Sequence, residues 1–477
     1  MPEFDAVIGL EIHIQLHTQT KLFAPEAHIF GASPNQLVSP ITMAHPGALP
    51  RINEGVIDKA LALGLALNCK INSPTFFDRK NYFYPDLPKG YQISQDAVPI
   101  CEGGTVKFPN TKGEILEVPL ERIHLEEDAG KSIHDLSPTY TMIDLNRAGT
   151  PLMELVTQPA LHKAEDAAAL FEEIRRLVRY LNVGEGDMEK GNLRCDANIS
   201  VKPQGQEKLG IRVEVKNLNS FAFLTQAINH EIKRQIQLIQ SGGEVQRETR
   251  TWNVQLQKTQ PMRDKELAHD YRYFPEPDLP VIVISPERIE AVRQQLPSLP
   301  YQRFQQYHLD WKLPYNESMT LAEDMMLGNY YELAITHCQN PKGVANWLLG
   351  NVRSWMNEYN QPLSDCPVSA QTLGELVKAI DEGIVSHHQA KNQIFPALLQ
   401  AETSLKELLE ANQSESADQS SQLKTQIEAI ISEHPDELKR YRGGQKKLKK
   451  FFIGQVMKTL KGKGDPKEVQ KILNELL

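Results

Sequence analysis

Acidic side chains and a histidine occupy the polar side of several segments that alternate between apolar and polar residues. In segment 6–17 the apolar residues recur at every second position, so Glu11 and His13 share the opposite face of one predicted strand. Carboxylate oxygens with one imidazole suit a hard divalent cation, and the scarcity of thiolates favours Mg²⁺ or Mn²⁺ over zinc. We therefore predict one metal site made of Glu11, His13, Glu126, Asp196 and Glu214.

Strands that join in one sheet must position these side chains. If the four segments pair antiparallel, their polar sides form a single face. On any one strand the charges are more simply explained as a solvated face, because antiparallel sheets commonly wet one side. Four acidic strands together favour a metal, because clustered carboxylates need a compensating cation. Glu127 is the weakest candidate, because the two-residue period turns it away from Glu126.

Two runs rich in proline and aromatic residues, 76–95 and 262–280, are predicted to be ordered loops. Basic side chains in and near these runs could clamp phosphates beside the metal. Local salt bridges explain any one of them equally well. The candidate phosphate-binding residues are Arg79, Lys80, Lys89, Arg147 and Lys216.

Composition indicates an ordinary soluble protein: 477 residues suffice for two to four domains, with 40% hydrophobic and 24% charged residues. The densest apolar stretch, 61–67, is too short for a membrane helix. No basic residue precedes Lys21, so neither a secretory nor a transit peptide is predicted. We expect a cytoplasmic, membrane-free protein. The five cysteines form no CxxC pair, which argues against a disulfide framework or a structural zinc.

The net charge of −9 hides a basic segment near the end of the chain. Between Lys439 and Lys463 there are ten Lys or Arg residues and no Asp or Glu. A concentrated basic patch on an acidic protein steers a polyanion to one place. Leu448, Val456 and Leu460 follow a helical stripe there, so we expect them in a core and the lysines at the surface.

The chain divides into a strand-rich part and a helical part. Strand patterns run to about residue 290 around two helices, 163–184 and 221–243, and helical periodicity follows. The polar tract 411–422 is predicted to be a linker or long loop. The fold class is therefore α+β. The predicted domains are 1–290, 291–405 and 406–477.

Several familiar motifs are excluded. The segment EDAGKS ends like a phosphate-binding P-loop, but Leu125 stands where its first glycine belongs. In GEGDMEKG, Glu189 replaces the last glycine of a dinucleotide fingerprint. Cys195 lies on the apolar side of its strand, which indicates a buried, inert thiol. No nucleophile for cleaving an amide is evident.

The chain closely resembles the B subunits of glutamyl-tRNA(Gln)/aspartyl-tRNA(Asn) amidotransferases over nearly its whole length. The motifs that carry the resemblance are GLEIH, DRKNYFYPDLPKGYQISQ, RIHLEEDAGK, DLNRAGTPLMELV, RCDANISV, EVKNLNSF, MRDKELAHDYRYFPEPDLP, FFIGQVMK and KGKGDP. It implies an N-terminal cradle domain with an antiparallel sheet akin to glutamine synthetase and guanidino kinases, followed by an all-α tail of two helical subdomains. ATP would phosphorylate the side-chain carboxylate of Glu or Asp on mischarged tRNA, and ammonia would displace the phosphate.

The resemblance also implies cofactors and partners. These are ATP and Mg²⁺, mischarged tRNA(Gln) or tRNA(Asn), and a heterotrimer with a glutaminase A subunit and a small C subunit. The five predicted metal ligands match the family's site and would be its catalytic residues. Its tRNA-binding tail would correspond to Lys446, Lys447, Lys449, Lys450, Lys458, Lys461 and Lys463.

One departure concerns zinc. Some members bind zinc through two cysteine pairs after the first strand, where this chain has Ala24, Ser39 and Thr42, so we predict no zinc and a loop held by packing.

Two alternative functions stay open at this point. One is a noncatalytic tRNA-binding scaffold, and the other is a free-standing ligase that amidates a small acid.

Overall fold

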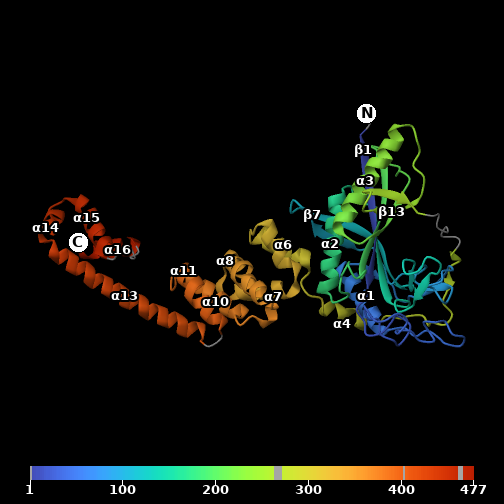
Figure 1. Cartoon of the computed structure of the whole chain (residues 1–477), viewed down its shortest axis with the longest axis horizontal. Coiled ribbons are helices and arrows are strands. Elements are labelled where there is room, and N and C mark those ends of the chain that lie inside the picture. The colour runs from blue at the N-terminus through green and yellow to red at the C-terminus, as the bar shows by residue number, and fades with distance from the viewer. Residues whose placement is uncertain (1–2, 263–270, 401–402, 460–465) are drawn as a thin grey trace. The chain divides into compact units, whose positions relative to one another are not determined.

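The computed structural model describes residues 3–262, 271–400, 403–459 and 466–477, and it forms two compact units, 1–328 and 329–477 (Figure 1). The first unit continues past the boundary predicted at 290. Helix α4 (Pro286–Gln294) packs on α1 (Glu54–Ala66), and α5 (Pro300–Gln305) packs on α2 (Ala164–Tyr180), which ties these helices to the first unit. The predicted domain boundaries at 290 and 405 stay predictions.

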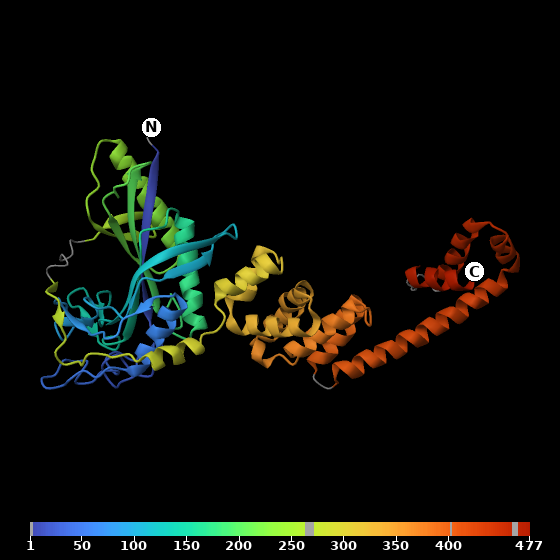
Figure 2. The same cartoon turned by 180° about the vertical axis from the view of Figure 1, so that it is seen from behind.

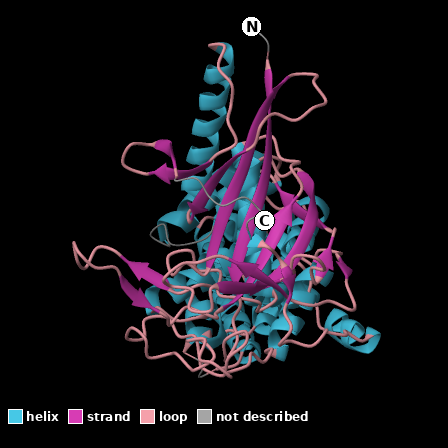
Figure 3. Ribbon diagram, turned by 90° about the vertical axis from the view of Figure 1, so that its right-hand side faces the viewer, coloured by secondary structure: helices cyan, strands magenta, loops and turns pink. Residues whose placement is uncertain are grey.

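One large sheet forms the body of the first unit, and Figure 3 shows its long strands as a twisted layer. The main path runs β14-β13-β12-β11-β1-β10-β7-β4-β3-β15. The strands are β1 (Phe4–Gln15), β2 (Lys70–Ile71), β3 (Asp78–Asn81), β4 (Tyr91–Ser94), β5 (Cys101–Glu102), β6 (Thr105–Pro109), β7 (Ile115–Glu127), β8 (Lys131–Ile133), β9 (Met142–Asp144), β10 (Pro151–Thr157), β11 (Leu193–Pro203), β12 (Val213–Leu218), β13 (Thr249–Asn253), β14 (Lys258–Pro261) and β15 (Phe274–Pro275).

The sheet is mixed, so the predicted antiparallel pairing holds for all strand pairs in the described residues except one. Strands β12 and β13 pair in parallel, whereas the other pairs are antiparallel. The reason is the connection between them. Helix α3 (Phe221–Gln240) follows β12 and carries the chain back, so that β13 starts at the same end of the sheet.

The hydrophobic core lies between the sheet and its helices. Ile8, Leu10 and Ile12 of β1 are fully buried, and α2 and α3 pack side by side against this face (Figures 1 and 2). Both helices were predicted from their apolar periodicity. Because the helices cover the apolar face, the odd-numbered residues of β1 lie on the opposite, polar face.

The second unit is helical throughout its described residues, and the long helix α13 is visible in Figure 2. The tract 411–422 lies inside α13, so the predicted linker is wrong. This tract is polar but contains no Gly or Pro, and Ala, Gln and Glu favour helix. The remaining α-helices of the described residues are α6 (Tyr315–Glu323), α7 (Met325–Cys338), α8 (Pro341–Trp347), α9 (Arg353–Tyr359), α10 (Ala370–Asp381), α11 (His387–Gln389), α12 (Phe395–Leu399), α13 (Leu405–Glu433), α14 (Pro435–Arg442), α15 (Lys449–Thr459) and α16 (Pro466–Leu476).

The basic segment includes α15, which forms a small hydrophobic core with α13 and α16. Phe452 and Val456 of α15 are buried with Ile427 and Leu473, as the helical stripe predicts in part. Four of the candidate lysines are exposed, while Lys449 is half-buried and bonds Asn474. Lys461 and Lys463 lie outside the described residues.

Among described residues, no helix combines the length and apolar character needed to span a bilayer.

The loop that follows β1 is held by a polar cluster as well as by packing. The Lys21 side chain is fully buried, and its Nζ donates to the carbonyl oxygen of Leu37 at 2.7 Å and lies 3.5 Å from Glu26 Oε1. Thr42 donates to the same Glu26 carboxylate. Predicted packing alone therefore describes this loop incompletely. The absence of zinc stays a prediction.

Candidate active site

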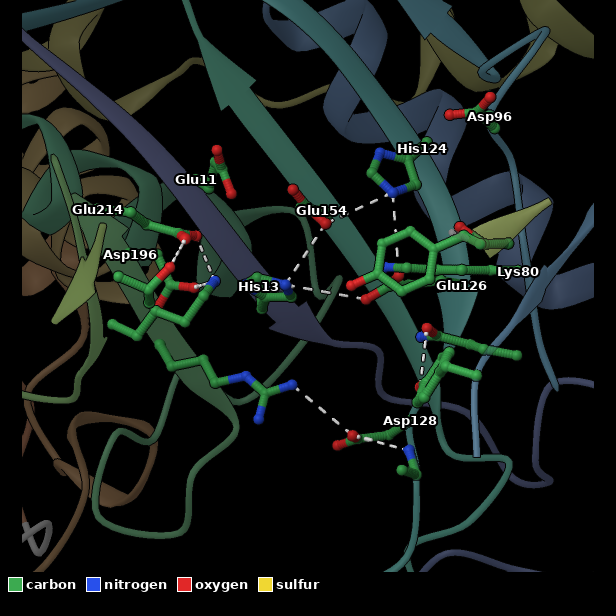
Figure 4. Close-up of a pocket in the computed structure, with 18 of the residues that line it drawn as sticks. Glu11, His13, Lys80, Asp96, His124, Glu126, Asp128, Glu154, Asp196 and Glu214 are labelled. Atoms are coloured by element: carbon green, nitrogen blue, oxygen red, sulfur yellow. Dashed lines mark hydrogen bonds and ion pairs between the residues drawn. The ribbon is translucent and has the colours of Figure 1, made fainter. Parts of the chain in front are cut away.

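Strand register brings together side chains that are far apart in the sequence. His13 of β1 lies directly opposite Glu154 of β10, and Glu154 lies opposite His124 of β7. Glu126 follows two residues after His124 and projects from the same face of β7. Figure 4 shows His13, Glu154, His124 and Glu126 converging.

His13, Glu126 and Glu154 form one potential metal-binding cluster, with one ligand atom from each within 4.8 Å of the others. His13 Nε2 lies 3.4 Å from Glu154 Oε2 and 3.8 Å from Glu126 Oε1. His124 Nε2 lies 3.5 Å from the same oxygen, Glu154 Oε2. Glu126 is buried and the other two ligands are half-buried.

The electrostatics of this cluster reflect two carboxylates held together away from water. Burial raises the pKa of Glu126, and the neighbouring Glu154 raises it further. Burial lowers the pKa of His13, but Glu154 and Glu126 outweigh burial and raise it to about 9. Burial lowers the pKa of His124 to about 4. The cluster therefore attracts positive charge.

Glu11, Asp196 and Glu214 form a second cluster on neighbouring strands. The ammonium of Lys216 pairs with both Asp196, at 2.7 Å, and Glu214. Glu11 Oε1 accepts a hydrogen bond from Asn198 Nδ2 at 2.8 Å. The chain's own cation thus compensates two of these three acids.

The five predicted ligands therefore lie on one face but do not form one shell. In the part of the chain that is described, His13 and Glu126 belong to the first cluster, and Glu11, Asp196 and Glu214 form the second (Figure 4). Sequence reasoning also missed Glu154. Its neighbours on the same face, Leu152 and Val156, are apolar, so β10 shows no alternation. The remaining signal was a single acid inside an apolar strand.

A cavity of about 770 Å³ opens over this face. Lys80, Arg122, Arg194 and Lys216 place positive charge around it. Burial lowers the pKa of Lys80, but Glu126, Tyr273, Glu154 and Tyr271 together more than offset this, so the pKa lies above its ordinary value. Lys80 therefore stays charged and is a suitable phosphate contact.

Of the predicted phosphate contacts, Lys80 and Lys216 line the cavity, whereas Arg79, Lys89 and Arg147 are absent from its described lining. Alternation along β3 points Arg79 away from Lys80. The guanidinium of Arg79 instead binds Glu276, at 2.7 and 2.8 Å, and Asp278 at 3.0 Å.

The other two cations are also engaged near the cavity rim. Lys89 pairs with Glu127, which faces away from Glu126 as the two-residue period predicts. Arg147 donates to the carbonyl oxygens of Ala129 and Gly130 at 3.0 and 2.7 Å. Their phosphate-binding roles stay predictions.

Comparison with known proteins gives the family. Residues 6–290 match the family described as the GatB/GatE catalytic domain, and residues 329–477 match the GatB domain. The chain is 43% identical to the B subunit of the aspartyl/glutamyl-tRNA(Asn/Gln) amidotransferase of Persephonella marina, with both chains covered completely. The chain belongs to the GatB family.

Two further relatives carry the same name. The protein of Thermodesulfovibrio yellowstonii is 41% identical, covering 100% of this chain and 99% of the relative. That of Trichodesmium erythraeum is 44% identical, covering 100% and 98%. Both GatB matches fall within the two compact units, the first inside 1–328 and the second on 329–477.

The first cluster of this GatB family member fits a divalent cation. It offers two carboxylates and one imidazole nitrogen, and it faces the cavity. The buried Nδ1 of His13 has no hydrogen-bond partner among the described residues, whereas Nε2 faces Glu154 and Glu126, so a cation bound here would take the place of the proton on Nε2. Oxygen-rich ligation of this kind suits Mg²⁺ or Mn²⁺. In the second cluster Lys216 already supplies the positive charge.

Proposed function

We propose that this chain uses ATP to activate the side-chain carboxylate of glutamate on mischarged tRNA(Gln), or of aspartate on mischarged tRNA(Asn), and that ammonia then converts it to the amide. The products are Gln-tRNA(Gln) and Asn-tRNA(Asn). Family membership makes the chain one subunit of a glutamine-dependent amidotransferase, a carbon–nitrogen ligase used in protein biosynthesis. The observation that carries the proposal is the cluster of His13, Glu126 and Glu154 beside Lys80 in one cavity.

The chemistry requires a better leaving group than the carboxylate offers. Attack of the side-chain carboxylate oxygen on the γ-phosphorus of ATP gives an acyl phosphate and releases ADP. Ammonia then attacks the acyl carbon, the C–O bond to phosphate breaks, and the nitrogen loses a proton as inorganic phosphate leaves. When bound, a divalent cation would supply positive charge that neutralises the reacting phosphates.

The residues of the cavity have separate tasks in this proposal. His13, Glu126 and Glu154 would hold the cation, and His124 orients Glu154. Lys80 would contact the transferred phosphoryl group, and Arg194, which also lines the cavity, would add positive charge. Lys216 keeps Asp196 and Glu214 in place at the far end of the site.

Ammonia comes from a separate glutaminase, the A subunit, with a small C subunit completing the heterotrimer. The cysteines support this division of labour: burial raises the pKa of the Cys195 and Cys101 thiols well above the ordinary value. A scaffold without catalysis would leave the acidic face exposed to solvent. Instead, Glu126 and Asp196 are buried at the cavity.

ATP cleavage that depends on mischarged tRNA tests the proposal. The purified complex is given ATP, Mg²⁺, Glu-tRNA(Gln) and ammonium chloride in place of glutamine. We expect Glu126→Gln to lose at least about a hundredfold in rate, because it removes a direct cation ligand. Glu117→Gln is the matched control, since Glu117 lies on the same strand and pairs at the surface with Lys107. Wild-type turnover by Glu126→Gln would overturn the proposal.

A further inference from the structure

Four tyrosines form a row that leads from the cavity to the molecular surface. The ring centroids of Tyr84 and Tyr82 lie 5.8 Å apart, those of Tyr82 and Tyr271 lie 6.0 Å apart, and those of Tyr271 and Tyr273 lie 6.1 Å apart. The interplanar angles are 69°, 69° and 74°, so each contact is edge-to-face. The rings therefore do not stack in parallel on one another.

The row joins the two loops predicted from the sequence, and its backbone is fixed. Asn81 Nδ2 donates to the carbonyl oxygens of Tyr271 and Arg272, at 3.0 and 2.9 Å, which holds the second loop beside β3. Tyr82 OH donates to Gln92 Oε1 at 3.2 Å. These bonds fix the backbone at Tyr271 and the ring of Tyr82 before any ligand arrives, which lowers the entropic cost of binding.

Exposure increases along the row toward the outside. Tyr271, Tyr273 and Tyr82 line the cavity and are half-buried. Tyr84 does not line it and keeps 60% of its surface exposed, and the adjacent Phe83 keeps 76%. Aromatic rings this exposed contribute little to the core, so packing does not explain them.

Positive charge accompanies the row. Lys80 Nζ lies 5.0 Å from the centroid of the Tyr271 ring. Neither Lys80 nor the exposed Arg272 has a carboxylate within ion-pair distance among the described residues. Arg79 and Lys89, by contrast, are already paired with acids. A row of aromatic faces flanked by free cations is the arrangement with which proteins bind single-stranded nucleic acid.

We propose that the row Tyr84–Tyr82–Tyr271–Tyr273 is the stacking platform for the unpaired 3′ nucleotides of the tRNA substrate. The inference rests on the proposed function, because the aminoacyl group sits on the last of these nucleotides and must reach the cavity. The rest of the tRNA chain has to extend out of the cavity, and the row of tyrosines runs from the cavity to the exposed Tyr84. ATP is a small ligand, so its base would not need the Tyr84 ring, which lies outside the cavity lining.

Steady-state kinetics of the complex, with ammonium as nitrogen donor, test this assignment. Loss of one base–aromatic contact is expected to raise the KM for mischarged tRNA by about tenfold in Tyr84→Leu, with kcat within about twofold of wild type. Tyr84→Phe, which keeps the ring, should retain the wild-type KM. Tyr140→Leu is the matched control, because Tyr140 is 77% exposed on the β8–β9 connection.

A second measurement uses a labelled single-stranded RNA, 5′-ACCA-3′, whose binding is followed by fluorescence anisotropy. Weaker binding by Tyr84→Leu and by Tyr82→Leu, with unchanged melting temperatures, supports the platform. Unchanged KM and unchanged RNA binding in both variants would overturn it. So would a raised KM for ATP with the KM for tRNA unchanged, since the row would then stack the nucleotide base. These outcomes are read with active wild-type protein, so they are distinct from a failure of the proposed function itself.

Discussion

His13 of β1 and Glu154 of β10 face each other across adjacent strands, with 3.4 Å between Nε2 of the histidine and Oε2 of the glutamate. This pairing brings polar side chains from two strands that are far apart in the sequence into one cluster. Glu126, from the next strand, completes it at 3.8 Å from the same imidazole nitrogen. The metal-binding capacity of the site thus depends on register as much as on residue type.

Lys216→Met is expected to destabilise the first unit. Lys216 compensates Asp196 and Glu214, and removing one partner of a buried ion pair leaves the others unpaired at a cost of about 3 kcal/mol. Thermal unfolding measures the loss. Lys202→Met, on strand β11 with no described ion pair, is the control. Equal melting temperatures for the two variants would show that Lys216 does not hold the second cluster together.

Much of this face was predictable from the sequence, because alternation with a two-residue period needs no tertiary information. It placed Glu11, His13, Glu126, Asp196 and Glu214 on the polar side, where the structure has them. Alternation does not give strand order, however. The division into two clusters and the inclusion of Glu154 follow from the β1–β10–β7 pairing, which is set by long-range packing.

Fold-level errors had local causes. The parallel β12–β13 pair was missed because α3 was recognised as a helix but not as a crossover between neighbouring strands. The tract 411–422 was predicted to be a linker because polarity was weighed above helix propensity, and the absence of Gly and Pro lets α13 run through it. Both α2 and α3 were predicted because each buries a clear apolar stripe.

Glu173 of α2 is expected to make stability depend on pH. Burial raises its pKa from 4.5 to about 7 despite the ion pair with Arg176, and its Oε1 has no hydrogen-bond partner among described residues. A raised carboxyl pKa gives stability that is complete below about pH 4.5 and is lost as the pH rises through about 7. Glu173→Gln cannot ionise, so it should gain stability relative to wild type as the pH rises through this window.

The check is thermal unfolding of both proteins at several pH values across that window. Glu172→Gln serves as the control, because Glu172 also pairs with Arg176 but is 44% exposed. A difference in melting temperature between Glu173→Gln and wild type that does not change with pH would contradict the prediction.

The basic segment is expected to contact tRNA phosphates. Replacing several exposed lysines with glutamate should weaken tRNA binding and make its salt dependence shallower, because fewer phosphate contacts release fewer counterions. The variant changes Lys446, Lys447, Lys450 and Lys458 together. Binding across a salt series measures the slope, and the KM for ATP should remain at the wild-type value. Identical slopes for variant and wild type would leave this segment as a soluble surface only.

The most direct test of the cation site is Mn²⁺ binding to the amidotransferase complex, measured by electron paramagnetic resonance. Glu154→Gln should weaken binding by at least about tenfold, because even residues that only orient a metal ligand contribute that much. Asp96→Asn, which removes an equal charge from the cavity lining but lies outside both clusters, should bind Mn²⁺ as wild type does. Wild-type affinity in Glu154→Gln, or an equal loss in Asp96→Asn, would contradict the assignment of the cation to His13, Glu126 and Glu154.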